Sequence, residues 1–208
     1  MVAGFGTPLS RSRDRATPEA EENQLEAALT AAREGDENGF AILWRDLHPR
    51  LLRYLRARGD AAPEDVAAEA WIQVMRGLAG FRGGAAEFRA WVFTIARNRA
   101  IDQGRARTRR PSVPVADPAA VMGESATVPS AEEHAEENES LSWALRLVAT
   151  LPPAQAEMVT LRVVAGLDVA DVARMLGKRP GTVRVGVHRG LRTLARTAAE
   201  DEWRGKLR

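Results

Sequence analysis

Cysteine is absent from the 208-residue sequence, and this absence excludes three kinds of site. Without a thiol, the chain forms no disulfide, binds no metal through cysteine sulfur and has no thiol with which to sense oxidation. A chain of this composition suits a reducing compartment, so we expect a cytoplasmic protein.

Long apolar runs are absent as well. No stretch reaches the roughly 18 consecutive apolar residues that a membrane-spanning helix needs. The N-terminus also lacks the basic start and following apolar segment of a secretory signal. We therefore expect no membrane insertion.

The patterns of catalytic and metal sites are missing too. The three histidines, His48, His134 and His188, are scattered, and no two have metal-ligand spacing on one helix. Gly83 and Gly84 follow no predicted strand, so they lack the setting of a phosphate-binding loop. The acidic run 132–139 remains a candidate metal site, although clustered glutamates in a linker are far more often solvated. We expect no enzyme activity, no metal and no cofactor.

What the sequence does contain is charge that is divided along the chain. The net charge of +2 does not by itself indicate a polyanionic partner. Residues 97–110, however, hold six arginines and one acid, whereas residues 132–139 hold five glutamates and no base. This separation indicates that different segments have different roles.

Two weakly apolar stretches divide the chain. Residues 1–22 are rich in Gly, Pro, Ser and charge without apolar periodicity, which predicts a disordered tail. Residues 111–138 combine four prolines with the acidic run, which predicts a flexible linker. The segments that remain, 23–110 and 139–208, show no internal repeat. We expect two small domains.

Both domains are predicted to be helical, because apolar residues recur three and four apart and no alternating strand pattern is present. In the first domain, a stripe from Phe40 to Leu55 predicts one long helix, which Gly59 and Asp60 end. Pro63 suits the first turn of the next helix. The predicted fold class is therefore all-α, with two helical domains joined by a flexible linker.

A third helix changes character along its length. Its predicted buried face consists of Phe88, Trp91, Val92 and Ile95. Continuing the same face leads to Arg99 and Asp102, so the C-terminal half of this helix leaves the core and should meet something polar. Basic and aromatic side chains occur together here, as in proteins that bind single-stranded DNA. The alternative is a solvated charged surface in which Arg97 or Arg99 pairs with Asp102.

The second domain contains a helix-turn-helix pattern over residues 161–195. Asp168 is placed to cap one helix, Gly177 to end it, and Pro180 to open the next. The next helix is predicted to bury Val183, Val187, Leu191 and Leu194. Its opposite face forms a basic ridge of the width that enters a DNA major groove. The alternative is an ordinary solvated arginine face. The ridge comprises Thr182, Arg184, His188, Arg189, Arg192 and Arg196.

Three segments together resemble the extracytoplasmic-function (ECF) group of bacterial sigma factors. They are PEDVAAEAWIQVMRGL (63–78), FRGGAAEFRAWVFTIARNRAID (81–102) and LPPAQAEMVTLRVVAGLDVADVARMLGKRPGTVRVGVHRGL (151–191). The resemblance extends from about Gln24 to Ala198. It implies a transcription initiation factor that binds RNA polymerase core enzyme, directs it to promoters and helps to melt the -10 element. An anti-sigma protein is the further partner that it implies.

The resemblance assigns roles to three groups of residues. Core-facing residues would meet the clamp helices of the largest polymerase subunit, and the flap of the second largest subunit is a further contact. The loop 81–87 would capture a flipped base of the -10 element. The residues implied are Asp65, Glu69 and Met75 for core; Arg82, Arg89, Arg97, Asn98, Arg99 and Arg105 for the -10 element; and Thr182, Arg184, Val185, His188, Arg189 and Arg192 for the -35 element.

The sequence also departs from the family pattern. Ala62 and Ala68 replace a capping aspartate and a polymerase-contacting glutamine, and Val185 and Gly186 replace a small hydroxyl residue and an arginine. A glycine inside a helix costs about 1 kcal/mol relative to alanine. The alternative function is a free-standing helix-turn-helix regulator that binds operator DNA as a dimer. It would leave the motifs of the first domain without a purpose.

Overall fold

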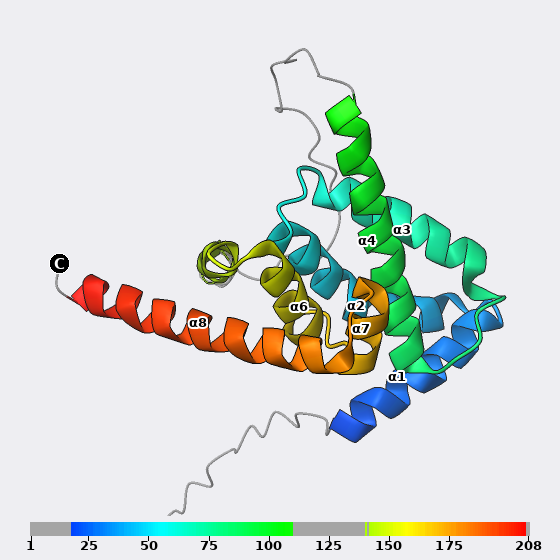
Figure 1. Ribbon diagram of the computed structural model, residues 1–208. Helices are drawn as coiled ribbons and strands as arrows, with labels where there is room; N and C mark the ends of the chain where they lie inside the picture. The colour runs from blue at the N-terminus through cyan, green and yellow to red at the C-terminus, as the bar shows by residue number, and fades with distance from the viewer. Residues whose placement is uncertain (1–17, 110–139, 141, 207–208) are drawn as a thin grey trace, which may run out of the picture.

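The computed structural model describes residues 18–109, 140 and 142–206, and its regular structure is helical throughout these residues (Figure 1). The all-α prediction is confirmed. The predicted linker, and the tail up to residue 17, lie outside the described residues. None of the helices in the described part of the chain is long and apolar enough to cross a membrane.

Helix α1 (Pro18–Arg33) begins inside the segment predicted to be a disordered tail. It packs on α2 through Ala28, Leu29 and Ala32, which are buried. The close approach depends on Gly39 of α2, where a Cβ would lie 2.7 Å from the carbonyl oxygen of Ala28. The apolar pattern of the sequence does not predict this helix, because its contact face is made mostly of alanine.

Helices α2 (Glu37–Ala57) and α3 (Pro63–Leu78) form the predicted pair. Asp36 caps α2, since its carboxylate accepts hydrogen bonds from the backbone N–H groups of Asn38 and Gly39. Gly59, with φ of 78°, allows the turn between the two helices. Ala62 provides no side-chain cap for α3, as its sequence predicted.

Helix α4 (Ala85–Arg109) runs unbroken from core to solvent. Phe88, Val92, Phe93 and Ala96 are buried, whereas the described side chains from Gly104 onward are exposed. Its last turns stand clear of the neighbouring helices in Figure 1. The predicted change from an apolar to a charged face is therefore confirmed.

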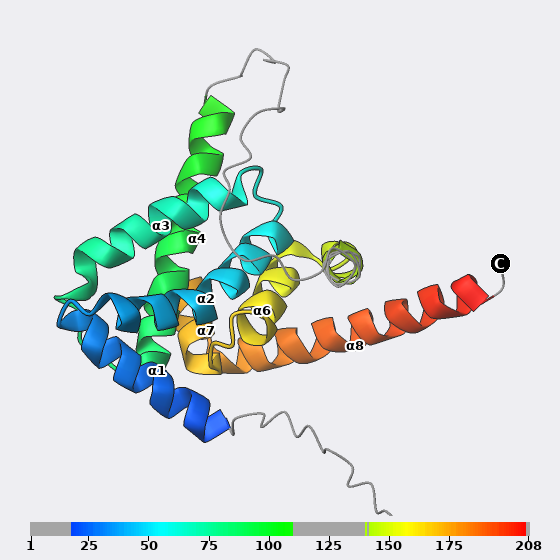
Figure 2. The same cartoon turned by 180° about the vertical axis from the view of Figure 1, so that it is seen from behind.

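The second domain consists of a helical segment over 142–149 followed by α6 (Pro153–Val163), α7 (Val169–Leu176) and α8 (Pro180–Lys206). Asp168 caps α7 by accepting a hydrogen bond from the N–H of Asp171. Gly177 ends α7 in the left-handed conformation, with φ of 62°. The predicted turn chemistry is confirmed. The C-terminal half of α8 extends away from the rest of the molecule (Figures 1 and 2).

One part of the α8 prediction is wrong. Leu191 is 43% exposed, and the buried positions include Gly186 and Gly190. A Cβ on Gly186 would lie 2.4 Å from Met158 Cε, and one on Gly190 would lie 2.6 Å from Val159 Cγ2. The two glycines let α8 lie directly on α6. This close approach gives a structural reason for the two glycines, which inside a helix would otherwise only be destabilising.

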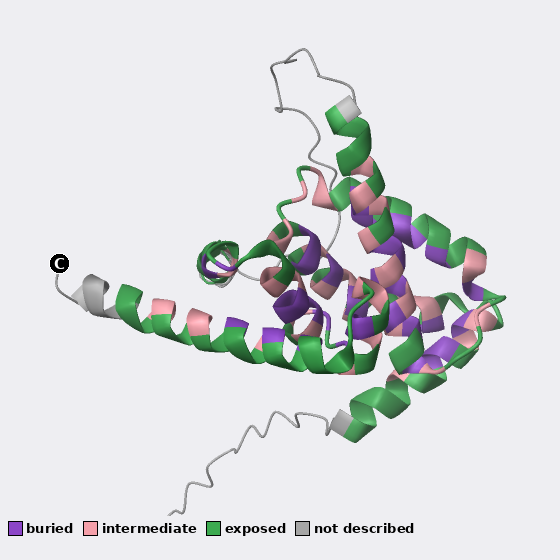
Figure 3. Ribbon diagram, in the orientation of Figure 1, coloured by how far each residue is buried: buried purple, intermediate pink, exposed green. Residues whose placement is uncertain are grey.

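The two helical units are in contact with each other. α6 packs against α2, and the buried cluster of the N-terminal unit (α1 to α4) continues into the C-terminal unit (142–206) through Met158, Leu161 and Leu167. Figure 3 shows buried residues running through the region where these helices meet. The arrangement brings residues far apart in the sequence close to α4.

Candidate polymerase and nucleic-acid interfaces

The face of α3 opposite the core carries the three residues predicted to contact polymerase. Asp65, Glu69 and Met75 are all exposed, and Met75 is 60% exposed. Ile72, on the same helix, is also exposed although it is large and apolar. Two large apolar side chains, Ile72 and Met75, are thus exposed on a helix face that also carries two carboxylates, which is the composition of a surface that binds a protein partner.

Helix α2 adds an exposed aromatic side chain to this part of the molecule. Trp44 stacks on the His48 ring, with centroids 4.4 Å apart, and is 41% exposed. The Nδ1 of His48 accepts a hydrogen bond of 3.2 Å from Trp71 Nε1. Partial burial lowers the pKa of His48, Arg56 lowers it further, and Glu64 opposes the shift. From the sequence, Trp44 is predicted only as part of the apolar stripe of α2.

The first turn of α3 is tied to α2 by an ion pair in place of the missing cap. Arg56 Nη2 donates to Glu64 Oε1 over 2.8 Å. This hydrogen bond is the main reason that the pKa of Glu64 is lowered. The pair holds the start of the candidate polymerase surface although Ala62 offers no capping group.

The loop predicted to capture a base leads into α4 and is held by two carboxylates. The N–H of Gly84 donates to Glu87 Oε2, and the N–H of Ala85 donates to Glu26 Oε2 of α1 over 2.6 Å. Phe81 stacks on Trp91, with ring centroids 5.0 Å apart. The loop is thus fixed at its end by α1 and at its start by an aromatic contact.

The arginines predicted for the -10 element differ in their surroundings. Arg82 is exposed and donates to the backbone carbonyls of Ala79 and Phe81. Arg89 is only 13% exposed at its side chain, where it pairs with Glu22 of α1 at 3.3 Å. Its Nε atom is buried without a hydrogen-bond partner. Arg89 therefore lies between helices.

Further along α4, three of the four predicted residues lie at the surface of the N-terminal unit: Asn98, Arg99 and Arg105. Arg99 Nε donates to Gln73 Oε1 of α3 over 3.1 Å, and Asn98 is exposed. Arg105, whose side chain is 70% exposed, lies 3.9 Å from Asp102. The suggested pairing of Asp102 with Arg97 or Arg99 is wrong, because these arginines have other partners.

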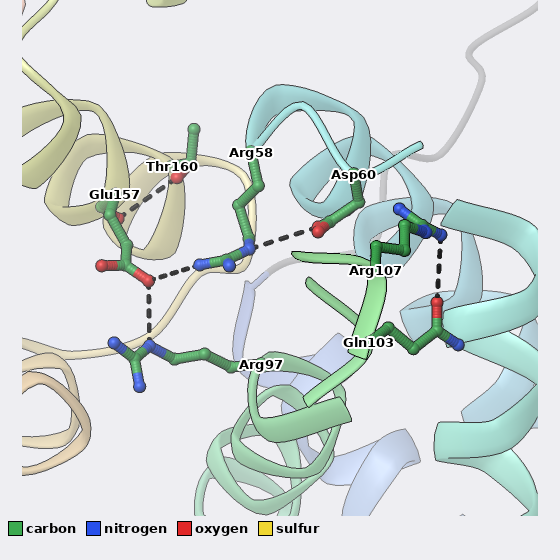
Figure 4. Close-up of polar contacts among 7 residues, drawn as sticks. All are labelled: Arg58, Asp60, Arg97, Gln103, Arg107, Glu157 and Thr160. Atoms are coloured by element: carbon green, nitrogen blue, oxygen red, sulfur yellow. Dashed lines mark hydrogen bonds and ion pairs between the residues drawn. The ribbon is translucent and has the colours of Figure 1, made fainter. Parts of the chain in front are cut away.

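Arg97 is the fourth of these residues, and its partner comes from the C-terminal unit. Its Nε donates to Glu157 Oε1 of α6 over 2.9 Å, and Arg58 of α2 donates to the same oxygen (Figure 4). The sequence patterns did not predict Glu157 and Arg58 as members of this cluster. One signal was available, since Glu157 is the only acidic residue in α6.

The residues predicted to read the -35 element share the exposed side of α8. Three of the six border a shallow groove between α8 and α6 that includes Gln155 and Met158. Val185, which is 50% exposed, lines this groove with Thr182 and Arg189. Gly186 faces α6 and is not on the exposed ridge. The exposed residues are Thr182, Arg184, Val185, His188, Arg189 and Arg192.

Metal chemistry has no visible basis in the described residues, where no three ligating side chains come together. The exposed surfaces are instead of two kinds. One is acidic and apolar, on α3, and the other is basic, on α4 and α8. The first suits a protein partner and the second suits a polyanion.

Comparisons with known proteins agree with this division. The family described as Sigma-70 region 2 matches residues 43–110, and the family described as Sigma-70, region 4 matches residues 141–194. ECF RNA polymerase sigma factor ShbA of Streptomyces griseus is 36% identical over 182 residues, which cover 84% of this chain and 95% of the relative. ECF RNA polymerase sigma factor BldN of Streptomyces coelicolor is 32% identical over 193 residues, covering 90% and 70%.

Solved structures share the fold. The structure of CnrH in complex with the cytosolic domain of CnrY matches with a TM-score of 0.57 at 19% identity, covering 86% of this chain and 99% of that chain. The sigma factor RpoE in complex with the anti-sigma factor NepR, from Bartonella quintana, matches with a TM-score of 0.52 at 20% identity, covering 74% and 93%.

Proposed function

The chain belongs to the extracytoplasmic-function (ECF) family of RNA polymerase sigma factors, and from this premise we propose how its surfaces divide the work of transcription initiation. It is an initiation factor that binds RNA polymerase core and directs it to promoters. The observation that carries this function is the presence of both sigma-70 regions in order along the chain. A free-standing regulator is not favoured, because the N-terminal match is to Sigma-70 region 2.

The core enzyme binds α3 through Asp65, Glu69 and Met75. We add Ile72 and Trp44 to this surface, since both are large, apolar and exposed. Acidic residues around an apolar centre suit the clamp helices of the largest subunit if those helices present basic residues. The flap of the second largest subunit contacts the C-terminal unit.

Promoter DNA follows two basic surfaces. The loop 81–87 takes the flipped base of the -10 element, while Arg82, Arg89, Arg97, Asn98, Arg99 and Arg105 serve the strand around it. Arg82, Asn98 and Arg105 are exposed, whereas Arg89 and Arg97 must first exchange a carboxylate partner. The chain takes part in melting by binding a strand, and it contributes no catalytic groups or cofactor.

The -35 element lies along the exposed ridge of α8. Thr182 and Arg184 stand in its first turns, where a helix in the major groove meets base edges. Val185 offers a methyl contact to thymine, and His188, Arg189 and Arg192 follow toward the phosphates.

The chain is organised in two functional domains, and a partner protein controls it. Residues 23–110 and 139–208 are the functional domains, with 1–22 as a tail and 111–138 as a linker. An anti-sigma protein is a partner, as the anti-sigma factor NepR is for the sigma factor RpoE in their complex, and the protein acts in the cytoplasm.

Co-purification with core enzyme followed by run-off transcription tests the function. We expect the chain to bind core and to start transcripts at promoters selected from genomic fragments. Tight promoter-specific binding by the chain alone, without core, would favour the free-standing regulator instead.

A further inference from the structure

Two arginines of the N-terminal unit converge on one carboxylate oxygen of the C-terminal unit. Arg58 Nη1, at the end of α2, lies 2.7 Å from Glu157 Oε1, and Arg97 Nε, on α4, lies 2.9 Å from the same atom. Figure 4 shows the two guanidinium groups approaching Glu157 from different helices. Arg58 and Glu157 are 99 residues apart in sequence, so this is a contact between the units.

Arg58 is held in place by its own unit. Its Nε donates to Asp60 Oδ2 over 3.2 Å, and its guanidinium carbon lies 5.8 Å from the centroid of the Tyr54 ring. Burial alone would lower the pKa of Arg58, but Tyr54, Asp60 and Glu157 outweigh it and raise the pKa. Arg58 therefore stays charged, and Asp60 and Tyr54 hold its guanidinium group by contacts that do not involve Glu157.

The charges explain why an anion is needed here. In the described part of the N-terminal unit, Asp60 is the one carboxylate that forms an ion pair with either arginine, and it pairs with Arg58. This leaves an excess positive charge at a site where the side chains of Arg58, Asp60 and Arg97 are about one-fifth exposed or less. An uncompensated charge in a partly desolvated site is unfavourable. Glu157 supplies the missing negative charge.

We propose that Arg58 and Arg97 form a binding site for a DNA backbone phosphate, and that Glu157 occupies this site when the chain is free. Two guanidinium groups directed at one oxygen are the arrangement that binds phosphate well. Arg97 lies on the same helix as Asn98, Arg99 and Arg105, so a strand that follows α4 would reach it. The inference rests on the proposed function and adds Arg58, together with its competitor Glu157, to the DNA-binding surface.

The consequence is that DNA and the C-terminal unit compete for one site. A phosphate can bind Arg58 and Arg97 only after Glu157 has left, and Glu157 leaves only when α6 moves or its side chain turns away. The chain without polymerase should therefore bind a single strand more weakly than its arginines would allow.

The test measures binding of a fluorescein-labelled single-stranded 20-nucleotide DNA to the full-length chain by fluorescence anisotropy, at several salt concentrations. Glu157→Gln removes the competing charge and keeps the shape of the side chain. We expect it to bind the strand about three- to tenfold more tightly than the wild type. Glu34→Gln, at an exposed glutamate between α1 and α2, has the same change in net charge and should have little effect.

Arg58→Gln completes the test as a double-mutant cycle. In the wild-type background, it should change strand affinity little, because Glu157 already occupies the site. In the Glu157→Gln background, it should abolish the gain and reduce the magnitude of the slope of log affinity against log salt by about 0.7, the value for one phosphate contact on a single strand. A purely structural role of Arg58 would affect both backgrounds alike.

Equal affinities for Glu157→Gln and Glu34→Gln, with both variants folded by circular dichroism, would overturn the competition. An unchanged salt slope on adding Arg58→Gln to Glu157→Gln would overturn the phosphate site. If Glu157→Gln fails to fold, Glu157→Asp replaces it, because the shorter side chain withdraws the carboxylate from both arginines. It should then bind the strand more tightly than the wild type, and an affinity equal to that of the wild type would overturn the competition. Run-off transcription by the wild type with core tests the proposed function separately.

Discussion

The two basic helices of this sigma factor present their arginines in different ways. On α4, Arg89, Arg97 and Arg99 each contact a side chain from another helix, and two of the three partners are carboxylates. On α8, Arg184, Arg189 and Arg192 lie exposed on one ridge. The surface of α8 can therefore meet DNA as it stands, whereas that of α4 must first exchange partners. Among the described residues, the basic surface of α4 is thus the one that a rearrangement within the chain can control.

The largest expected effect is on binding of the core enzyme, and it distinguishes the polymerase surface on α3 from the basic surfaces on α4 and α8. Reversing Asp65 and Glu69 to lysine should weaken core binding by about 2–5 kcal/mol, because interfacial charges would lose their partners and gain like-charge repulsion. Binding of the C-terminal unit to -35 DNA should not change. The measurement is titration of labelled core enzyme, with Glu34→Lys combined with Glu200→Lys as the control of equal charge change. An unaltered core affinity in a folded double variant would remove α3 from the interface.

A second prediction separates base reading from phosphate binding on α8. Arg184→Ala should cost roughly 1–3 kcal/mol on the correct -35 element and relax base preference at one position. Arg192→Ala should instead weaken binding to all sequences and reduce the salt slope by about one ion. Competition binding to -35 variants at several salt concentrations measures both. If the two variants exchanged these effects, the helix would lie in the groove in a different orientation.

A third prediction concerns the seating of α8. Gly190→Ala should destabilise the fold by about 1–3 kcal/mol, because the new Cβ would meet Val159 Cγ2 at 2.6 Å. Gly181→Ala is the matched control, since no heavy atom lies within 4 Å of its Cβ position, and it should be neutral or stabilising. Thermal unfolding followed by circular dichroism gives the comparison. A Gly190→Ala variant as stable as Gly181→Ala would mean that α6 and α8 separate at little cost.

The smallest effect is expected at His48, beside the polymerase surface. Its pKa is lowered in the folded chain by burial and by Arg56, so the unfolded chain takes up this proton first as the pH falls. Stability due to neutral His48 is complete above the unfolded pKa of about 6.5 and is lost as the pH falls below it. His48→Asn retains an acceptor for Trp71 but does not titrate. Its free energy of unfolding should depend less on pH between 7 and 5; an identical dependence in both proteins would contradict this cause.

Local features were predictable from the sequence where one short segment determines them. Asp168, Gly177 and Pro180 each act within a few residues, and the helix-turn-helix formed where they indicated. Leu191 was misplaced because the pattern of apolar residues cannot show that Gly186 and Gly190 allow α6 to pack directly on that face.

The partners of the α4 arginines were not predictable in the same way. Arg97 pairs with Glu157, 60 residues further along, and Arg89 pairs with Glu22, 67 residues earlier. Such contacts depend on how distant helices pack in three dimensions, which periodicity and spacing do not contain. The composition predicted that α4 carries a basic surface, but not which of its charges are already occupied.

Helix α6 joins the two surfaces through consecutive residues. Glu157 reaches Arg58 and Arg97 on one side, while the next two residues, Met158 and Val159, touch the glycine positions of α8 on the other. Because α8 packs directly on α6 at these two glycines, a movement of α6 should carry α8 with it. Where Glu157 leaves the two arginines through such a movement, the direction of the DNA-reading ridge changes as well.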